Sequence, residues 1–162
     1  MPRLHLIVLD TSASMRQGGR LAMAKGYATR LIEQAAQAGD HVALLRFGGS
    51  GVELLLPPSP ARVAASTRVR KLGGGGGTPL VECLREAERL LQRAQRRDGL
   101  LSEENSWLWL LTDGRTLERP TAPAAAGHIV IIDFDQSARP IGRCGTWARQ
   151  WSAEHRLAAS CS

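Results

Sequence analysis

Short apolar segments alternate with longer amphipathic ones along almost the whole chain, and this alternation limits the fold more than any other feature. The short segments have the length and composition of buried strands, and the longer ones have helical periodicity. Strand-like segments are residues 4–9, 41–47, 52–56, 106–112 and 128–133, with an edge strand expected at 156–159; helical segments are residues 21–38, 61–72, 78–97 and 143–155. Strands that alternate with helices join through right-handed crossovers, which align the strands in parallel. We therefore expect an α/β fold with a three-layer, doubly wound, Rossmann-like, mostly parallel sheet.

One edge strand is expected to run against the others. Residues 48–51 are the whole connection between segments 41–47 and 52–56, and they are mostly glycine. So short a connection joins antiparallel neighbours. The 162 residues are the size of one domain and contain no internal repeat, so we expect a single domain over residues 1–162.

The core and the cellular location follow from simple features. A chain of this size buries roughly 70% of its unfolded surface and needs no disulfides. Cys83, Cys144 and Cys161 are too far apart for a paired metal or redox motif, so reduced thiols are expected. No apolar run is long enough to cross a membrane. Residues 1–4 lead almost directly into the first strand without a signal peptide, so we expect a cytoplasmic protein.

The chain is basic, with 21 Lys and Arg against 15 Asp and Glu, a net charge of +6. This charge fits nucleic acid, an acidic protein partner or solubility alone. Four arginines gather at the end of one helix, where cations complement the helix dipole: Arg89, Arg93, Arg96 and Arg97. Aromatic residues that stack on bases are not interleaved with the basic ones. Nucleic acid is therefore the least favoured of these partners.

Polar residues follow the first strand at alternate positions, namely Asp10, Ser12 and Ser14. On an extended backbone, side chains at alternate positions point to the same side. One carboxylate and two hydroxyls can therefore converge just past a buried strand. Oxygen ligands of this kind suit Mg2+ or a similar hard cation rather than zinc or copper.

Two further oxygen ligands also have ordinary structural explanations. Thr78 follows five glycines at 73–77. With Pro79 at the first helical position, Thr78 would make a good helix N-cap. A capping box is not expected, because Val81 stands where it would need Glu or Gln. Asp113 begins an Asp-Gly turn, which is common after strands. A capping Thr can still present its hydroxyl to a ligand. Asp113 also lies at the carboxyl end of a strand, where ligands bind in such sheets.

Together these pieces form a pattern of D-x-S-x-S after the first strand, a Gly-rich Thr-Pro before a helix and T-D-G after a later strand. This pattern, which extends over nearly the whole chain, resembles the von Willebrand factor A family and its metal-ion-dependent adhesion site. The resemblance implies five metal ligands, some acting through water: Asp10, Ser12, Ser14, Thr78 and Asp113. It also implies a bound Mg2+ or Mn2+ with one open coordination position, which in this family a carboxylate of a partner protein fills.

Further segments, residues 20–26, 40–47, 54–58 and 75–80, are similar to the C-terminal domain of magnesium-chelatase D subunits and their cobaltochelatase relatives. Those subunits help to insert Mg2+ or Co2+ into tetrapyrroles, as in cobalamin biosynthesis, together with an AAA+ ATPase subunit and a large catalytic subunit. The resemblance implies a non-catalytic interaction module whose metal docks an acidic residue of either partner. D subunits usually carry an AAA+-like region and an acidic, Pro-rich linker before this domain. We therefore expect either a free-standing relative or a fragment.

Other functions fit less well at named positions. No Lys follows Gly77, as a phosphate-binding P-loop requires, and the glycine run does not follow the first strand, as in a dinucleotide fingerprint. A phosphohydrolase of the haloacid dehalogenase type needs Asp where Ser12 stands. Asp133 and Asp135 have that spacing with too little chain after them, so Asp133 is interpreted as a strand-end residue. Two alternatives stay open: a Mg2+-dependent phosphohydrolase, and a partner of an AAA+ ATPase outside tetrapyrrole biosynthesis.

Overall fold

The computed structural model describes residues 2–49, 51–97, 101–135 and 142–158. They form a six-stranded sheet in the order β3-β2-β1-β4-β5-β6. The strands are β1 (Leu4–Asp10), β2 (His41–Gly48), β3 (Gly51–Pro60), β4 (Ser106–Thr112), β5 (His128–Asp133) and β6 (Glu154–Leu157). The helices are α1 (Arg20–Ala38), α2 (Ser66–Arg70), α3 (Leu80–Arg97) and α4 (Cys144–Trp151), with short 3-10 turns at Ala13–Gly19, Val63–Ala65 and Glu103–Asn105.

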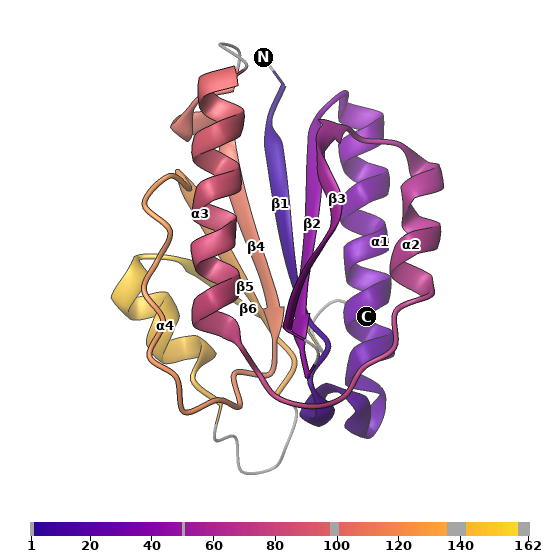
Figure 1. Ribbon diagram of the computed structural model, residues 1–162, viewed down its shortest axis with the longest axis vertical. Helices are drawn as coiled ribbons and strands as arrows, with labels where there is room; N and C mark the ends of the chain where they lie inside the picture. Colours follow the sequence, from indigo (N-terminus) through magenta and orange to yellow (C-terminus); the bar gives the residue numbers. More distant parts are fainter. Residues whose placement is uncertain (1, 50, 98–100, 136–141, 159–162) are drawn as a thin grey trace.

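The sheet confirms the expected fold class. β3 pairs antiparallel with β2 at one edge, and all other neighbouring strands are parallel. Helices α1 and α2 cover one face, and α3 and α4 cover the other (Figure 1). In the described part of the chain, no helix combines the length and the apolarity that a membrane crossing requires.

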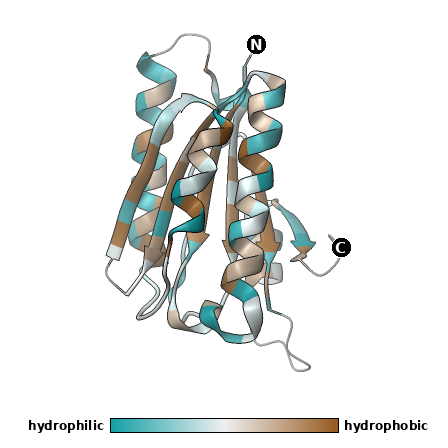
Figure 2. Cartoon of the chain, turned by 90° about the vertical axis from the view of Figure 1, so that its right-hand side faces the viewer, coloured by the Kyte–Doolittle hydropathy of each residue, from teal (hydrophilic) through white to brown (hydrophobic). Residues whose placement is uncertain are grey.

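The continuous apolar run of β1 exists because both faces of this central strand are buried. Leu6 and Val8 pack with the α3 and α4 side of the core. Ile7 and Leu9 point the other way and pack with the α1 side. In Figure 2 the apolar residues lie along the strands, and the hydrophilic ones lie mostly on the outer faces of the helices. A strand buried on both faces needs no polar alternation.

Two expected boundaries are wrong. The last helix ends at Trp151, not at residue 155, because Ser152 adopts a left-handed conformation (φ 53°) and ends it. The edge strand β6 consequently begins at Glu154, two residues before the expected start, and its expected last residue, 159, lies outside the described residues.

The region 57–72 also differs from expectation. Pro57, Pro58 and Pro60 do not end the third strand, and β3 continues to Pro60 with a register irregularity opposite β2. Proline is tolerated there because an edge strand donates hydrogen bonds on one side only. The expected helix at 61–72 is a 3-10 turn followed by α2, whose five residues end at Arg70.

Candidate metal centre

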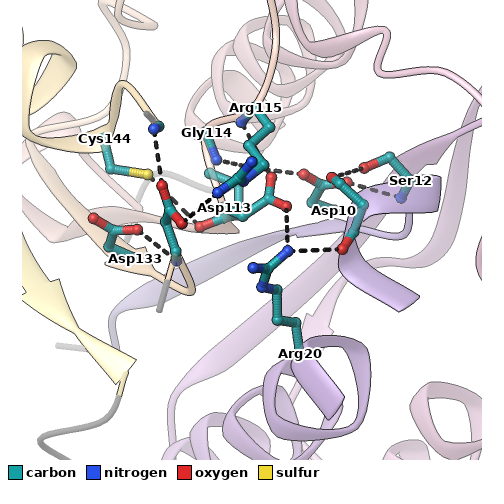
Figure 3. A network of polar contacts seen from close by, with 12 residues as sticks. Asp10, Ser12, Arg20, Asp113, Gly114, Arg115, Asp133 and Cys144 are labelled. Carbon is teal, nitrogen blue, oxygen red and sulfur yellow. Dashed lines mark hydrogen bonds and ion pairs between the residues drawn. The ribbon is translucent and has the colours of Figure 1, made fainter. Parts of the chain in front are cut away.

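The candidate ligands lie at the carboxyl ends of β1 and β4, which are parallel neighbours in the middle of the sheet. The chain leaves β1 through α1 on one face and enters β4 from α3 on the other, so the direction of winding reverses between these two strands. Ligands of doubly wound sheets bind at this point. Asp10 ends β1 and Asp113 directly follows β4, so the topology alone brings the two carboxylates to one place. Figure 3 shows them in one polar network.

Asp10 is fully buried. Its Oδ1 accepts a hydrogen bond from the Ser12 backbone N–H at 2.8 Å, and its Oδ2 accepts one from Thr112 Oγ1 at 2.6 Å. Burial raises the pKa of Asp10 to about 6; hydrogen bonds from Ser12 and Thr112 oppose the rise, and the charge of Asp113 adds to it. At neutral pH the centre therefore holds a carboxylate whose charge its surroundings stabilise poorly, which favours a cation.

Ser12 and Ser14 do converge, but not through an extended backbone. Ser12 is buried, and its Oγ lies 3.4 Å from the Ser14 Oγ. The chain already turns into a 3-10 helix at Ala13, and this turn carries the Ser14 hydroxyl back toward Ser12. The expected convergence holds, and the expected cause was wrong.

Asp113 supplies the clearest sign of an incomplete environment. Its Oδ1 accepts the backbone N–H of Arg115 at 3.1 Å, in a turn where Gly114 has a positive φ of 68°. Its Oδ2 is buried and accepts no hydrogen bond from any described residue. Buried carboxylate oxygens normally have partners. The ion-pair partner of this Oδ2 among the described residues, the Arg20 guanidinium, lies 3.7 Å away and donates no hydrogen bond to it. A buried carboxylate oxygen in this state fits a hard cation such as Mg2+.

Arg20 is a member of the centre that the sequence analysis missed. Its guanidinium donates to the Ser14 carbonyl oxygen at 3.1 Å and lies 3.7 Å from Asp113 Oδ2. It begins α1, where the helix dipole disfavours a cation. The sequence signal that could have revealed Arg20 is its position, because an arginine is unfavourable at the start of a helix unless its side chain has another partner. Figure 3 shows Arg20 pointing toward Asp113.

The glycine run is fastened beside the Asp10 loop by backbone hydrogen bonds. Gly75 N–H donates to the Thr11 carbonyl at 2.7 Å, Ala13 N–H donates to the Gly76 carbonyl at 3.1 Å, and Gly49 N–H donates to the Gly75 carbonyl at 2.7 Å. This places the start of Thr78's segment next to the loop that carries the serines. Within the part of the chain that the structure describes, however, the Thr78 hydroxyl makes no hydrogen bond to the other four candidate ligands.

Thr78 does not cap α3 through its side chain either. The first two N–H groups of the helix, those of Leu80 and Val81, donate to Glu118 Oε1 at 2.7 and 3.1 Å. Glu118 comes from the connection after β4, five residues beyond Asp113. The connection after β4 therefore supplies one candidate ligand, Asp113, and through Glu118 it also fixes the start of α3, the helix that follows the candidate ligand Thr78. No local sequence pattern reveals this link.

Glu118→Ala is expected to destabilise the domain by about 1 kcal/mol, because the Val81 N–H loses its acceptor and the Leu80 N–H keeps only the Thr78 carbonyl oxygen at 2.8 Å. At this chain length that corresponds to a fall in Tm of about 3 °C in thermal unfolding followed by circular dichroism. Glu118→Gln keeps a side-chain oxygen and should lose less. Equal melting of both variants and the wild type would contradict the capping role.

Asp133 lies in the outer part of the same polar network and is not among the candidate ligands (Figure 3). Its Oδ1 accepts the Asp135 N–H at 2.9 Å, and its Oδ2 pairs with His155 Nε2 at 2.9 Å. Asp135 in turn pairs with Arg115 at 2.9 Å. Asp133 thus behaves as the strand-end residue that was expected.

Among the described residues, no group of three or more His, Cys, Asp and Glu could hold a metal. Cys83 and Cys144 are free thiols, as expected. Cys161 lies outside the described residues.

A doubly wound sheet with two carboxylates, two hydroxyls and a glycine-rich loop at its carboxyl edge defines a known class of domain. The von Willebrand factor type A domain family model matches residues 5–115, and the chain belongs to that family. A solved von Willebrand factor type A protein from Catenulispora acidiphila superposes with a TM-score of 0.73 at 17% identity, covering 98% of this chain and 40% of that one.

The chain is also homologous to magnesium-chelatase subunits. It is 41% identical to the magnesium-chelatase 60 kDa subunit of Cereibacter sphaeroides over 113 residues, 70% of this chain and 19% of that subunit. It is 32% identical to an uncharacterized protein of Mycobacterium tuberculosis over 161 residues, 93% of this chain and 25% of that protein. The chain therefore spans a quarter or less of the length of these curated relatives.

Proposed function

We propose that this chain is a metal-dependent protein-interaction module and has no catalytic role of its own. A Mg2+ or Mn2+ ion would be held at the carboxyl edge of β1 and β4 by five residues: Asp10, Ser12, Ser14, Thr78 and Asp113. The buried Asp113 Oδ2, which lacks a hydrogen-bond donor among the described residues, is the observation that carries the proposal. Bound there, the metal supplies a fixed positive charge and an open position for an oxygen ligand.

The charge of the centre favours a carboxylate as the incoming ligand. Asp10 and Asp113 balance the two charges of the metal, and the hydroxyls contribute none. Arg20 adds a positive charge at the centre, 3.7 Å from Asp113 Oδ2. The loaded centre is therefore cationic and would attract an Asp or Glu of a partner protein. The net charge of +6 would steer an acidic partner toward it, and salt would weaken that contribution.

The homology indicates the assembly in which such a module would act. We assign the chain to a chelatase complex for Mg2+ or Co2+, as a D-type subunit or its domain. Its partners there would be an AAA+ ATPase subunit and the large chelatase subunit, one of which presents the acidic residue. A role with an AAA+ ATPase outside tetrapyrrole biosynthesis is the alternative with the same site chemistry. No arrangement of the described residues favours the phosphohydrolase, because Ser12 stands where that chemistry needs a second Asp.

Binding to the purified AAA+ and large subunits of a magnesium chelatase tests the proposal. With Mg2+ present, biosensor measurements should detect binding to at least one of them. EDTA or Asp113→Asn should weaken that binding by at least about tenfold, because either change removes the charge that receives the carboxylate. Glu104→Gln makes the same type of chemical change at an exposed carboxylate in the turn before β4, far from the carboxyl ends of the strands, and should bind like the wild type. Binding that is indifferent to EDTA would refute the metal-dependent mechanism.

A further inference from the structure

A second surface lies at the other end of the molecule from the candidate metal centre. A groove of about 300 Å³ runs between β3 and α3. It is lined by His41 at the start of β2, by Pro60 at the end of β3 and by Arg97 at the end of α3. In Figure 1 the carboxyl ends of β1 and β4, where the candidate metal centre lies, are at the opposite end of the sheet from the amino end of β2. His41, at that amino end, lines the groove. Whatever binds in the groove therefore leaves the metal centre free.

The groove has an apolar floor. Leu90 and Leu101 are buried at 6% and 5% exposure and belong to the core on the α3 side. Leu54, Pro57 and Pro58 form the opposite wall on β3, and Leu54 is 40% exposed. An apolar side chain that entered the groove would pack on these residues and remove the exposed apolar surface of the groove from water.

The rim on the α3 side is cationic. Arg93 and Arg97 are exposed, one helical turn apart, and both line the groove. In the part of the chain that the structure describes, neither is paired with a carboxylate and no Asp or Glu lines the groove. Elsewhere on the same helix, by contrast, Arg89 is paired with Glu86 at 3.1 Å. Two neighbouring cations beside an apolar groove are complementary to a ligand that combines carboxylates with apolar side chains.

The edge of the sheet restricts how such a ligand is held. β3 is an edge strand, and its free side could extend the sheet by pairing with another strand. Pro57, Pro58 and Pro60 carry no backbone N–H, so within residues 57–60 of β3 only Ser59 has an N–H to donate to an added strand. We therefore expect the ligand to be held mainly through its side chains. We propose that the groove between β3 and α3 is a metal-independent docking site for an acidic peptide segment of another protein, with an apolar residue in the groove and carboxylates on Arg93 and Arg97.

Fluorescence anisotropy with labelled peptides tests this docking site. The probe is Asp-Asp-Leu-Pro-Leu-Asp-Asp; one comparison peptide replaces Asp by Asn, and another replaces Leu and Pro by Ser. The acidic apolar peptide should bind the wild type at least about tenfold more tightly than either comparison peptide, and EDTA should not change this. Arg93→Glu combined with Arg97→Glu should abolish the binding. Arg89→Glu combined with Arg96→Glu makes the same change in net charge on α3 outside the groove and should preserve it.

Four outcomes would overturn the proposal. The first is that the probe does not bind at about 1 mM. The second is that both double variants weaken binding equally, because equal weakening would indicate only a general attraction of the acidic peptide to a basic protein. Equal binding of the Ser peptide would show that the apolar groove contributes nothing. If EDTA weakened the binding, the peptide would be binding at the candidate metal centre, and this result would also refute the proposed docking site.

Discussion

Asp10→Asn is expected to stabilise the metal-free domain at neutral and alkaline pH and to remove the stabilisation that Mg2+ gives the wild type. The pKa of Asp10 is raised from 3.8 to about 6, mainly by burial. A carboxyl group with a raised pKa imposes no cost below pH 3.8, a growing cost between pH 3.8 and 6, and its full cost above pH 6. The rise corresponds to at most about 3 kcal/mol of lost stability.

The substitution suits the local hydrogen bonds. An Asn side-chain oxygen can still accept the N–H of Ser12, and its amide can donate to the hydroxyl oxygen of Thr112 after that hydroxyl rotates. Asparagine carries no charge, so the cost of burying the charge disappears. The same neutral side chain is a poor Mg2+ ligand here, because one of the two charges that hold the ion is lost.

Urea unfolding of both proteins between about pH 4 and pH 8, with and without Mg2+, measures these effects. Without metal, the variant should become more stable than the wild type as pH rises through 6. With Mg2+, only the wild type should gain. Asp40 is a control of opposite sign: burial raises its pKa, but hydrogen bonds from Arg3 and His5 lower it overall. Asp40→Asn should therefore lose stability at neutral pH. A metal-free Asp10→Asn variant that is less stable than the wild type at about pH 8 would refute the assigned cost.

Sequence periodicity sufficed to locate the strands along the chain, because strands buried on both faces leave continuous apolar runs such as that of β1. The alternation of strands with helices then predicted a mostly parallel sheet, but the order of the strands within the sheet came only from the structure. Boundaries were less predictable. Ser152 ends α4 in a conformation that its residue type does not announce. The prolines of β3 read as breakers and are in fact part of an edge strand, because whether a proline is tolerated depends on which side of the strand has a neighbour.

For the candidate metal centre, strand ends and residue chemistry indicated Asp10 and Ser12, whereas Asp113 was added by the resemblance to a known motif. The topology places Asp10 and Asp113 at the ends of neighbouring strands. Arg20 and Glu118 were missed because their roles depend on contacts between segments far apart in the sequence. Arg20 contacts Asp113 across the sheet edge. Glu118 accepts the N–H groups of a helix that begins 38 residues earlier. In a single sequence, the only sign of such a contact is a residue type that is unfavourable at its local position, such as Arg20 at the start of α1.

Gly76→Ala is expected to destabilise the domain and to weaken Mg2+ binding, whereas Gly77→Ala should do neither. Gly76 has a positive φ of 78°, and a Cβ there would overlap the backbone of Gly49. Both the left-handed conformation and the overlap oppose a side chain, so a loss of at least about 2 kcal/mol is expected. At Gly77 the φ is not positive, and a Cβ would meet no atom within 4 Å. The neighbouring glycine is thus a matched control within the same loop.

The effect on metal binding follows from what this loop is attached to. The Gly76 carbonyl accepts the N–H of Ala13, between the two serines of the candidate centre, and Thr78 follows two residues later. An alanine that pushes the loop away from Gly49 would therefore displace two parts of the proposed ligand set at once. Calorimetric titration with Mg2+ should show affinity reduced by at least about tenfold in Gly76→Ala, and thermal unfolding should show a fall in Tm of about 5 °C. If Gly76→Ala melts early but binds Mg2+ as the wild type does, the glycine run serves packing alone and Thr78 is not a ligand.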